Sequence, residues 1–139
     1  MDGTEVRIMN RHENIAEVIK TMEKFGAWHG IPDAVVIDFS VAVDEVLVNI
    51  MSHGYPDGAT GEILVRFVYR PGEVYAEIED DGVSFDPLRA PQPDLGATLQ
   101  ERKVGGLGIH FVRNLIDEVV YRRIEGHNIL RLKKRMPVI

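Results

Sequence analysis

The stretch that decides the fold is Val41-Ala42-Val43-Asp44-Glu45-Val46-Leu47-Val48-Asn49-Ile50-Met51-Ser52-His53-Gly54. Within it Glu45, Asn49 and His53 recur every four residues in an otherwise apolar run. An α-helix aligns such positions along one edge, so the stretch predicts a helix with a polar edge. The remaining positions are mostly apolar, which indicates that this helix is buried on most sides and central to the fold.

The helix extends backwards from this stretch to a proline. Pro32 is tolerated in a first helical turn, and Asp33 beside it favours the positive helix end, so the helix is predicted to run from there to His53. Its length would be roughly 33 Å at 1.5 Å per residue. Gly54-Tyr55-Pro56-Asp57-Gly58 then ends it, because glycine and proline break helices.

A second, amphipathic helix is predicted before this one. Apolar residues follow a spacing of three and four positions from Glu13 onward, and the helix is expected to start near 10–14 and to end at Gly30. Trp28 would extend its apolar face. The apolar positions that carry the spacing are Ile15, Val18, Ile19, Met22 and Phe25.

Alternating apolar and polar residues predict the strands. Val6 and Ile8 alternate with charged residues, which is typical of a short strand with one buried face. Residues 63–78 alternate on both sides of a Pro-Gly turn and predict a hairpin that stops at Asp80. Residues 119–132 predict a final hairpin in the same way.

The region between the two hairpins has a different character. Residues 85–104 contain three prolines and no sustained period, so they are expected to form a long loop, which in a compact domain is more often a functional lid than an accident. After Gly105-Gly106-Leu107-Gly108, the apolar positions from Ile109 to Ile116 predict another helix.

The predicted order is strand, helix, helix, hairpin, loop, helix, hairpin. Strands joined in hairpins pair antiparallel, and three amphipathic helices can cover one face of the resulting sheet. The expected fold class is therefore α+β, a two-layer α/β sandwich with a mixed, mostly antiparallel sheet and helices on one face. No internal repeat is visible, and residues 1–139 are expected to form a single domain.

Composition narrows the function classes. The chain has 139 residues, a formal net charge of −6 and no cysteine, which excludes disulfides, thiol nucleophiles and thiolate metal sites and argues against general nucleic-acid binding. Its first residues lack the pattern of a signal peptide and no window is apolar enough for a membrane span, so a cytoplasmic location is expected. The basic residues near the C-terminal end are interpreted as a solvated strand pair. They are Arg122, Arg123, Arg131, Lys133, Lys134 and Arg135.

Three polar clusters at predicted element ends can carry chemistry, and the first is Glu45 with Asn49. One helix turn separates them, so a carboxylate and a carboxamide oxygen point in the same direction. The carboxylate can orient a hydroxyl or water, and the amide oxygen can bind Mg²⁺, a hard ion that is commonly shared with phosphates. A polar helix edge that only caps neighbouring strands or faces water is the structural alternative.

The other two clusters are Asp80 with Gly82, and the glycines Gly105 to Gly108. A carboxylate at a strand end could accept a hydrogen bond from an exocyclic amine such as that of adenine, although Asp80-Asp81-Gly82 alone also suits an ordinary turn. The glycine cluster precedes a helix, so its backbone N–H groups could face phosphates. By itself it would equally suit a lid hinge.

In this order the three clusters resemble the motifs of a known superfamily. Glu45-x-x-x-Asn49, Asp80-x-Gly82 and Gly106-x-Gly108 are similar to the N, G1 and G2 boxes of the GHKL (histidine kinase-like) ATPases, which include gyrase, Hsp90, histidine kinases and the mismatch-repair protein MutL. More narrowly, the chain resembles the anti-sigma-factor serine/threonine kinases of bacteria. That resemblance also uses His53-Gly54-Tyr55, Val83-Ser84-Phe85-Asp86-Pro87 and Asp117-Glu118-Val119 with Tyr121, and it covers nearly the whole chain.

The resemblance implies a Bergerat-type ATP site that uses ATP and Mg²⁺. Asp80 with Gly82 would hold adenine, Asn49 would be the metal ligand, and Glu45 would be the general base. The lid segment Gly105, Gly106, Leu107 and Gly108 would wrap the phosphates. The chain departs from many relatives at Ser84, where they have a second glycine, and the lid from Pro87 to Lys103 is the least recognisable part.

The resemblance also implies partners and a reaction. Relatives phosphorylate a serine on a small STAS-domain anti-anti-sigma protein, hold a sigma factor inactive, and usually work as homodimers without contacting nucleic acid or membrane. The alternative is an ATP-binding partner-switch module with little or no turnover. A sensor histidine kinase fragment would need a phosphoacceptor histidine on a preceding dimerisation hairpin, which is not expected here, and a structural domain that binds no nucleotide is the last alternative.

Overall fold

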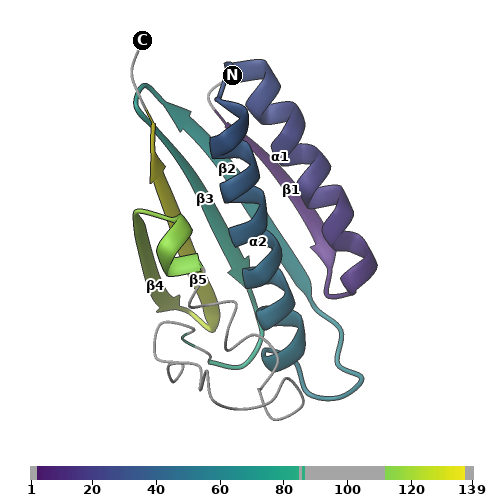
Figure 1. Ribbon diagram of the computed structural model, residues 1–139. Helices are drawn as coiled ribbons and strands as arrows, with labels where there is room; N and C mark the ends of the chain where they lie inside the picture. Colours follow the sequence, from purple (N-terminus) through teal and green to yellow (C-terminus); the bar gives the residue numbers. More distant parts are fainter. Residues whose placement is uncertain (1–2, 85, 87–111, 137–139) are drawn as a thin grey trace, which may run out of the picture.

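The computed structural model describes residues 3–84, 86 and 112–136 (Figure 1). A short helical segment without a label covers residues 112–115. The remaining elements are β1 (Gly3–Met9), the 3₁₀ turn η1 (His12–Asn14), α1 (Ile15–His29), α2 (Asp33–His53), β2 (Glu62–Arg70), β3 (Glu73–Asp80), β4 (Glu118–Ile124) and β5 (His127–Arg135).

The strands form one five-stranded sheet in the order β1-β2-β3-β5-β4. Every pairing among the described strands is antiparallel, so both predicted hairpins, β2–β3 and β4–β5, are confirmed. In the second hairpin, β5 and not β4 pairs with β3. This order pairs Asp80, at the end of β3, with Asn128 near the start of β5.

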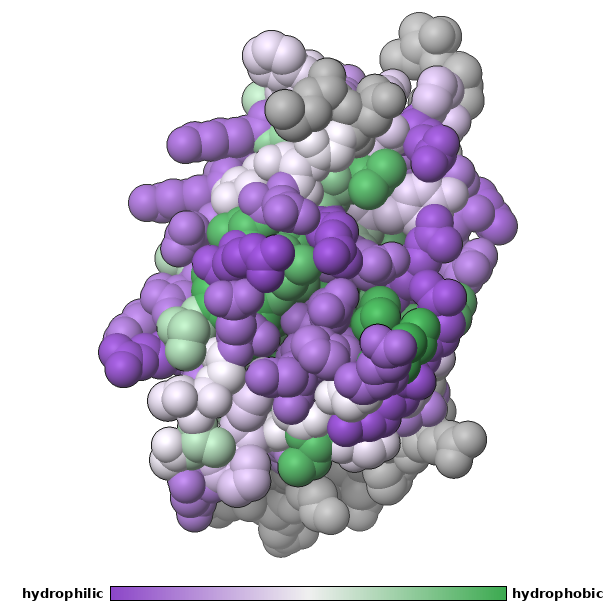
Figure 2. All heavy atoms as spheres, turned by 180° about the vertical axis from the view of Figure 1, so that it is seen from behind, coloured by the Kyte–Doolittle hydropathy of each residue, from purple (hydrophilic) through white to green (hydrophobic). Residues whose placement is uncertain are grey.

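Two layers result, as predicted. Helices α1 and α2 lie on one face of the sheet, with α2 over its middle (Figure 1). The opposite face is open and mostly hydrophilic in the view from behind (Figure 2). On that face Arg66 lies within ion-pair distance of Glu5, Glu77 and Glu79, at 3.6, 3.2 and 3.5 Å. This part of the open face therefore carries charge pairs between neighbouring strands.

Strand periodicity decides which side chains enter the core. In β3 every second residue is buried, and the series that begins at Val74 ends at Asp80. Because side chains alternate across a strand, the carboxylate of Asp80 lies on the same side as the apolar core and the helices. The two-residue period thus carries a charged group into the interior.

Helix α2 contributes most to the core, as its composition predicts. Phe39, Val43, Val46 and Leu47 are all at most 1% exposed. Each large apolar side chain buried to this extent contributes about 1.5–3 kcal/mol by the hydrophobic effect. The helix ends at His53, where the sequence predicts its end.

One prediction about α1 is wrong. Trp28 does not extend the apolar face, because its residue is 77% exposed. The ring of the next residue, His29, stacks instead on Tyr69 at 4.5 Å and meets Phe25 edge-on at 4.6 Å. Gly30 then ends the helix with a left-handed φ of 66°, as predicted.

The predicted helix from Ile109 to Ile116 is seen only in part. Residues 112–115 are helical, and Val112 and Ile116 are buried against the core, whereas 109–111 lie outside the described residues. Within the described part of the chain, no helix has the length and apolar character that crossing a membrane requires. The basic residues lie on β4 and β5, but the prediction that they are solvated is wrong for two of them. The side chains of Lys133 and Lys134 are only 20% and 17% exposed, and they pair with Glu73 at 3.1 Å and Asp38 at 3.5 Å.

The contact between α1 and α2 generates a stability prediction. A Cβ atom at Gly26 would lie 2.6 Å from Cγ2 of Val36, so glycine permits the close approach of the two helices. Although alanine gains up to about 1 kcal/mol in helix propensity, the overpacking costs about 1–3 kcal/mol. We expect Gly26→Ala to lower the free energy of unfolding by about 1–2 kcal/mol in urea denaturation.

Val36→Ala removes the obstructing methyl groups and supplies the control. In a double-mutant cycle, Gly26→Ala should be much less harmful in the Val36→Ala background. Equal effects in both backgrounds would contradict a steric role for Gly26.

Candidate functional site

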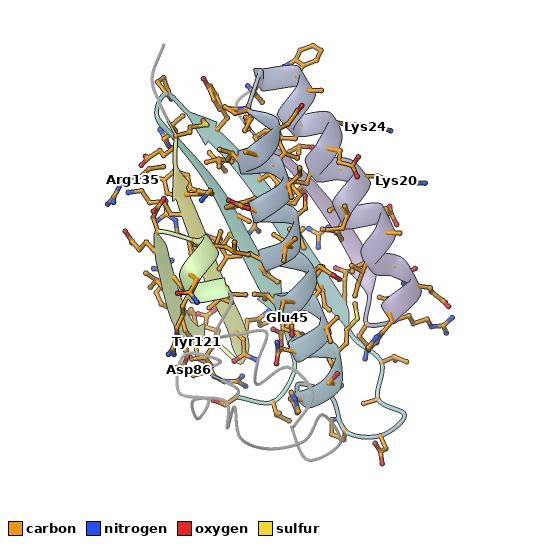
Figure 3. All side chains as sticks on the ribbon, in the orientation of Figure 1. Lys20, Lys24, Glu45, Asp86, Tyr121 and Arg135 are labelled. Atoms are coloured by element: carbon orange, nitrogen blue, oxygen red, sulfur yellow. The ribbon has the colours of Figure 1, made fainter. Side chains whose placement is uncertain are left out.

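A pocket lies at the end of the sandwich where α2, β3, β4 and β5 meet. Four of its eight lining residues are apolar or glycine, three carry an amide or carboxylate, and one is a tyrosine. The lining residues are Val46, Asn49, Ile50, Gly54, Asp80, Tyr121, Asn128 and Leu130. Figure 3 places Tyr121 on β4 and Glu45 on α2 at the same end of the molecule. Two of the sequence-predicted site residues, Asn49 and Asp80, thus line one pocket.

Asn49 is held by its own helix. Its side chain is buried, and Nδ2 donates to the backbone carbonyl of Glu45 at 2.8 Å and lies 3.5 Å from Oε1 of the same residue. The amide nitrogen therefore already has its acceptors within the helix. Within the part of the chain that the structure describes, the amide oxygen accepts no hydrogen bond, and it has the hard-donor chemistry that Mg²⁺ prefers.

Glu45 lies one turn before Asn49 on the same helix. Partial burial raises the pKa of the Glu45 carboxyl above its ordinary value, the neighbouring negative charge of Asp44 raises it further, and the contact with Asn49 opposes both. A carboxylate whose pKa is shifted towards neutrality is a better proton acceptor than an exposed one. The half-buried position and the raised pKa suit a general base.

Asp80 is the most deeply buried charged group of the site, at 3% exposure. Its Oδ1 atom accepts hydrogen bonds from the Gly82 N–H at 2.9 Å and from Nδ2 of Asn128 at 3.0 Å. Burial raises the pKa of the Asp80 carboxyl, and these two bonds act against it. Among the described residues both donors meet Oδ1, so the Oδ2 atom is the part of the carboxylate left to accept from a ligand.

Gly82 is required by a close backbone contact. A Cβ atom there would lie 2.4 Å from the carbonyl oxygen of Gly54, at the end of α2. The Val83 N–H donates to the same carbonyl at 2.7 Å, and Tyr55 Oη donates to Oδ1 of Asp81 at 2.8 Å. The turn after β3 is therefore fastened to the end of α2, which keeps Asp80 and Asn49 in one place.

The remaining predicted site residues have different outcomes. Gly105, Gly106, Leu107 and Gly108 lie outside the described residues, so their predicted contact with phosphates stays a prediction. His53 is the last residue of α2, in agreement with its interpretation as a helix end.

The sequence interpretation missed Asn128 as a site residue. Asn128 alternates with Leu130 and Leu132 on the buried side of β5 and is itself 5% exposed. A polar residue at a core position of a strand was the available signal, since buried polar groups need partners. Its partner Asp80 could not be found without knowing that β5 pairs with β3.

Comparisons with known proteins agree with this geometry. The family model for the histidine kinase-like ATPase domain matches residues 8–134. The serine/threonine-protein kinase BtrW of Bordetella bronchiseptica is 32% identical over 93 residues, which cover 67% of this chain and 66% of that protein. The serine-protein kinase RsbW of Bacillus pumilus is 29% identical over 140 residues, which cover 96% of this chain and 86% of that protein.

A solved structure shows the same fold. The crystal structure of the RsbU and RsbW domains of a Mycobacterium tuberculosis protein superposes with a TM-score of 0.70 at 18% identity, covering 99% of this chain and 34% of that one. The family model matches most of the chain, and the relatives are RsbW-type kinases. Both comparisons therefore indicate the same family. The chain belongs to the histidine kinase-like ATPase family, within the anti-sigma-factor serine kinase group that its motifs resemble.

Proposed function

We propose that this protein is an ATP- and Mg²⁺-dependent protein serine kinase that phosphorylates a STAS-domain antagonist and controls a sigma factor by partner switching in the cytoplasm. The observation that carries the proposal is that buried Asp80 and Asn49 line one pocket at the end of the sandwich, with Glu45 one helix turn before Asn49. The names of the relatives, which are serine kinases, supply the reaction class.

The pocket has a lining whose chemistry suits an adenine ring. Its apolar lining from Val46, Ile50 and Leu130 can contact the faces of a flat aromatic base. The Oδ2 atom of Asp80 can accept a hydrogen bond from the exocyclic amine, which would give the carboxylate the donor that its burial demands. Base recognition would thus rest on one charge-assisted hydrogen bond inside an apolar slot.

The α2 edge suits the phosphate end of the nucleotide. The amide oxygen of Asn49 would hold Mg²⁺, with phosphate oxygens as further ligands. When bound, the ion would neutralise phosphate charge and orient the γ-phosphoryl group. Asn49 is suited to this because its helix contacts occupy only the nitrogen of the amide.

Glu45 would act on the acceptor serine. It orients the hydroxyl and takes its proton as the bond from serine oxygen to phosphorus forms and the bond from phosphorus to the β-phosphate oxygen breaks, leaving ADP. Phosphoryl transfer depends mainly on positioning and charge neutralisation, so the base can accept the proton late.

Transfer would change the partner's affinity for electrostatic reasons. Phosphoserine carries about −1.5 to −2 charges, and this chain already has a formal net charge of −6. A newly charged, strongly hydrated group in a contact with an acidic protein weakens that contact by repulsion and desolvation. The release of the phosphorylated antagonist would leave the kinase able to bind the sigma factor.

The role of Glu45 is tested by Glu45→Gln, which keeps the shape and removes the basic oxygen. We expect ATP affinity within about twofold of the wild type and phosphate transfer to a cognate STAS protein reduced about 10²- to 10⁴-fold. The wild-type rate should fall as pH decreases through the raised pKa of Glu45, because only the carboxylate accepts the proton. Single-turnover transfer of labelled γ-phosphate measures both.

Glu23→Gln, on the exposed side of α1, is the control and should keep full transfer. If Glu45→Gln transfers phosphate at the wild-type rate, Glu45 is not the base. If the wild-type protein binds ATP and transfers none to its partner, the protein is a binding switch and the kinase proposal is lost.

The role of Asp80 is tested by Asp80→Asn. Loss of a hydrogen bond to a charged group costs about 1.5–3 kcal/mol, so ATP affinity should fall about 10- to 150-fold in calorimetric titration. Asp57→Asn neutralises an exposed carboxylate in the turn after α2 instead and should have a much smaller effect. Unchanged affinity in Asp80→Asn would remove Asp80 from the base site.

The role of Asn49 is tested through the metal. Wild-type protein should bind ATP more tightly with Mg²⁺ than with EDTA, and Asn49→Ala should bring the ratio of the two affinities close to one. Asn49→Asp retains an oxygen ligand and should retain a Mg²⁺ preference. A wild-type ratio in Asn49→Ala would show that another group holds the ion.

A further inference from the structure

The side chain of Asn128 is the centre of a hydrogen-bond cluster behind Asp80. Its Oδ1 atom accepts from Tyr121 Oη at 2.5 Å and from Nη1 of Arg123 at 2.9 Å. Its Nδ2 atom donates to Oδ1 of Asp80 at 3.0 Å and to the carbonyl of Val83 at 2.8 Å. These contacts place donors at the oxygen and acceptors at the nitrogen, as a carboxamide requires.

The chemistry of the neighbours determines how the amide is oriented. A guanidinium only donates, so Arg123 must face the oxygen of Asn128. A backbone carbonyl only accepts, so Val83 must face the nitrogen. Asp80 is then on the donor side, and the amide cannot rotate by 180° without opposing like groups at three contacts. Tyr121 and Arg123 therefore make Asn128 a donor to Asp80.

Arg123 also connects this cluster to the turn after β3. Its Nη1 atom also donates to the carbonyl of Gly82 at 3.2 Å, so one guanidinium links β4 to the turn that follows β3. Gly82 in turn supplies the second donor to Oδ1 of Asp80. Both donors that hold this oxygen are thus themselves held by Arg123.

We propose that Asn128, oriented by Tyr121 and Arg123, is a positioning residue that makes the site select adenine over guanine nucleotides. This inference rests on the proposed function, because it assigns a base specificity to the proposed ATP pocket. A carboxylate offers only acceptors to the base. With the six-position of the purine facing Asp80, adenine presents an exocyclic N–H₂ group and guanine presents a carbonyl oxygen, so the carboxylate accepts from adenine and repels that oxygen of guanine. The N1–H and 2-amino donors of guanine would reach the carboxylate only if the base shifted in the pocket.

The selection depends on Asp80 remaining ionised, because a protonated carboxyl group could donate to the guanine carbonyl. Burial raises the pKa of Asp80, while the bonds from Asn128 and the Gly82 N–H lower it. Among the charged neighbours, Asp81 raises the pKa of Asp80 and Arg123 lowers it, and the hydroxyl of Tyr55 is bonded to Asp81. Without the donor from Asn128, the carboxyl group would hold its proton to a higher pH.

The experiment measures the affinities of fluorescent ADP and fluorescent GDP for the full chain between pH 6 and 8.5. The wild type should prefer ADP throughout. In Asn128→Ala the preference should fall at least tenfold, and the fall should be larger towards the acid end of this range, because loss of the Asn128 donor raises the pKa of Asp80. Tyr121→Phe and Arg123→Met, which remove one donor each, should shift the same ratio in the same direction by a smaller factor.

Arg122→Met supplies the matched control. Arg122 is the exposed neighbour of Arg123 on β4, with the opposite strand orientation, and its variant should keep the wild-type preference at every pH. Thermal melting confirms that each variant is folded. If Asn128→Ala does not fold, the tyrosine and arginine variants still decide the question.

Two results would overturn the inference, and they differ. If the wild type binds neither nucleotide, the proposed function fails together with it. If the wild type prefers ADP and the Tyr121→Phe and Arg123→Met variants keep its ratio and its pH dependence, the nucleotide site stands and the role of Asn128 in selecting the base does not.

Discussion

The burial of one carboxylate is the constraint on which the site depends. Asp80 ends the central strand of the sheet on its core side, where water cannot solvate the charge. A charge in such a place is tolerated only when hydrogen bonds replace the lost water. Asn128 and the Gly82 N–H supply two of these bonds to a single oxygen, which leaves the second oxygen to be satisfied at the pocket. The fold thereby favours a ligand that carries an N–H group.

The same tension between burial and polarity shapes α2. Nine of its residues are buried, yet the edge with Glu45 and Asn49 stays polar because helix geometry keeps residues four apart on one side. The hydrogen bond from Asn49 to the Glu45 carbonyl satisfies the amide nitrogen locally. The polar edge of the helix therefore lies beside the pocket. Its amide oxygen and its carboxylate can contact a ligand there and do not need hydrogen-bond partners from the core.

Local patterns predicted most of the secondary structure. They predicted the helix from Asp33 to His53, the two hairpins and the end of β3 at Asp80. Hydrophobic periodicity and helix- or strand-breaking residues act over only a few positions, so they can be recognised in the sequence. Trp28 was misplaced because periodicity shows which face of a helix is apolar but not where the partner surface stops. Asn128 was overlooked because its role depends on a partner 48 residues away in the chain.

The sequence by itself determined the elements, the polar edge of α2 and the identity of the groups that can meet a nucleotide, since each follows from the spacing of neighbouring residues. Only the tertiary structure decided that β5 lies between β3 and β4, and therefore that Asn128 pairs with Asp80. Strand order depends on which surfaces pack when distant segments meet, and a two-residue period is the same in every order. The hydrogen bonds that orient the carboxylate exist only after that choice.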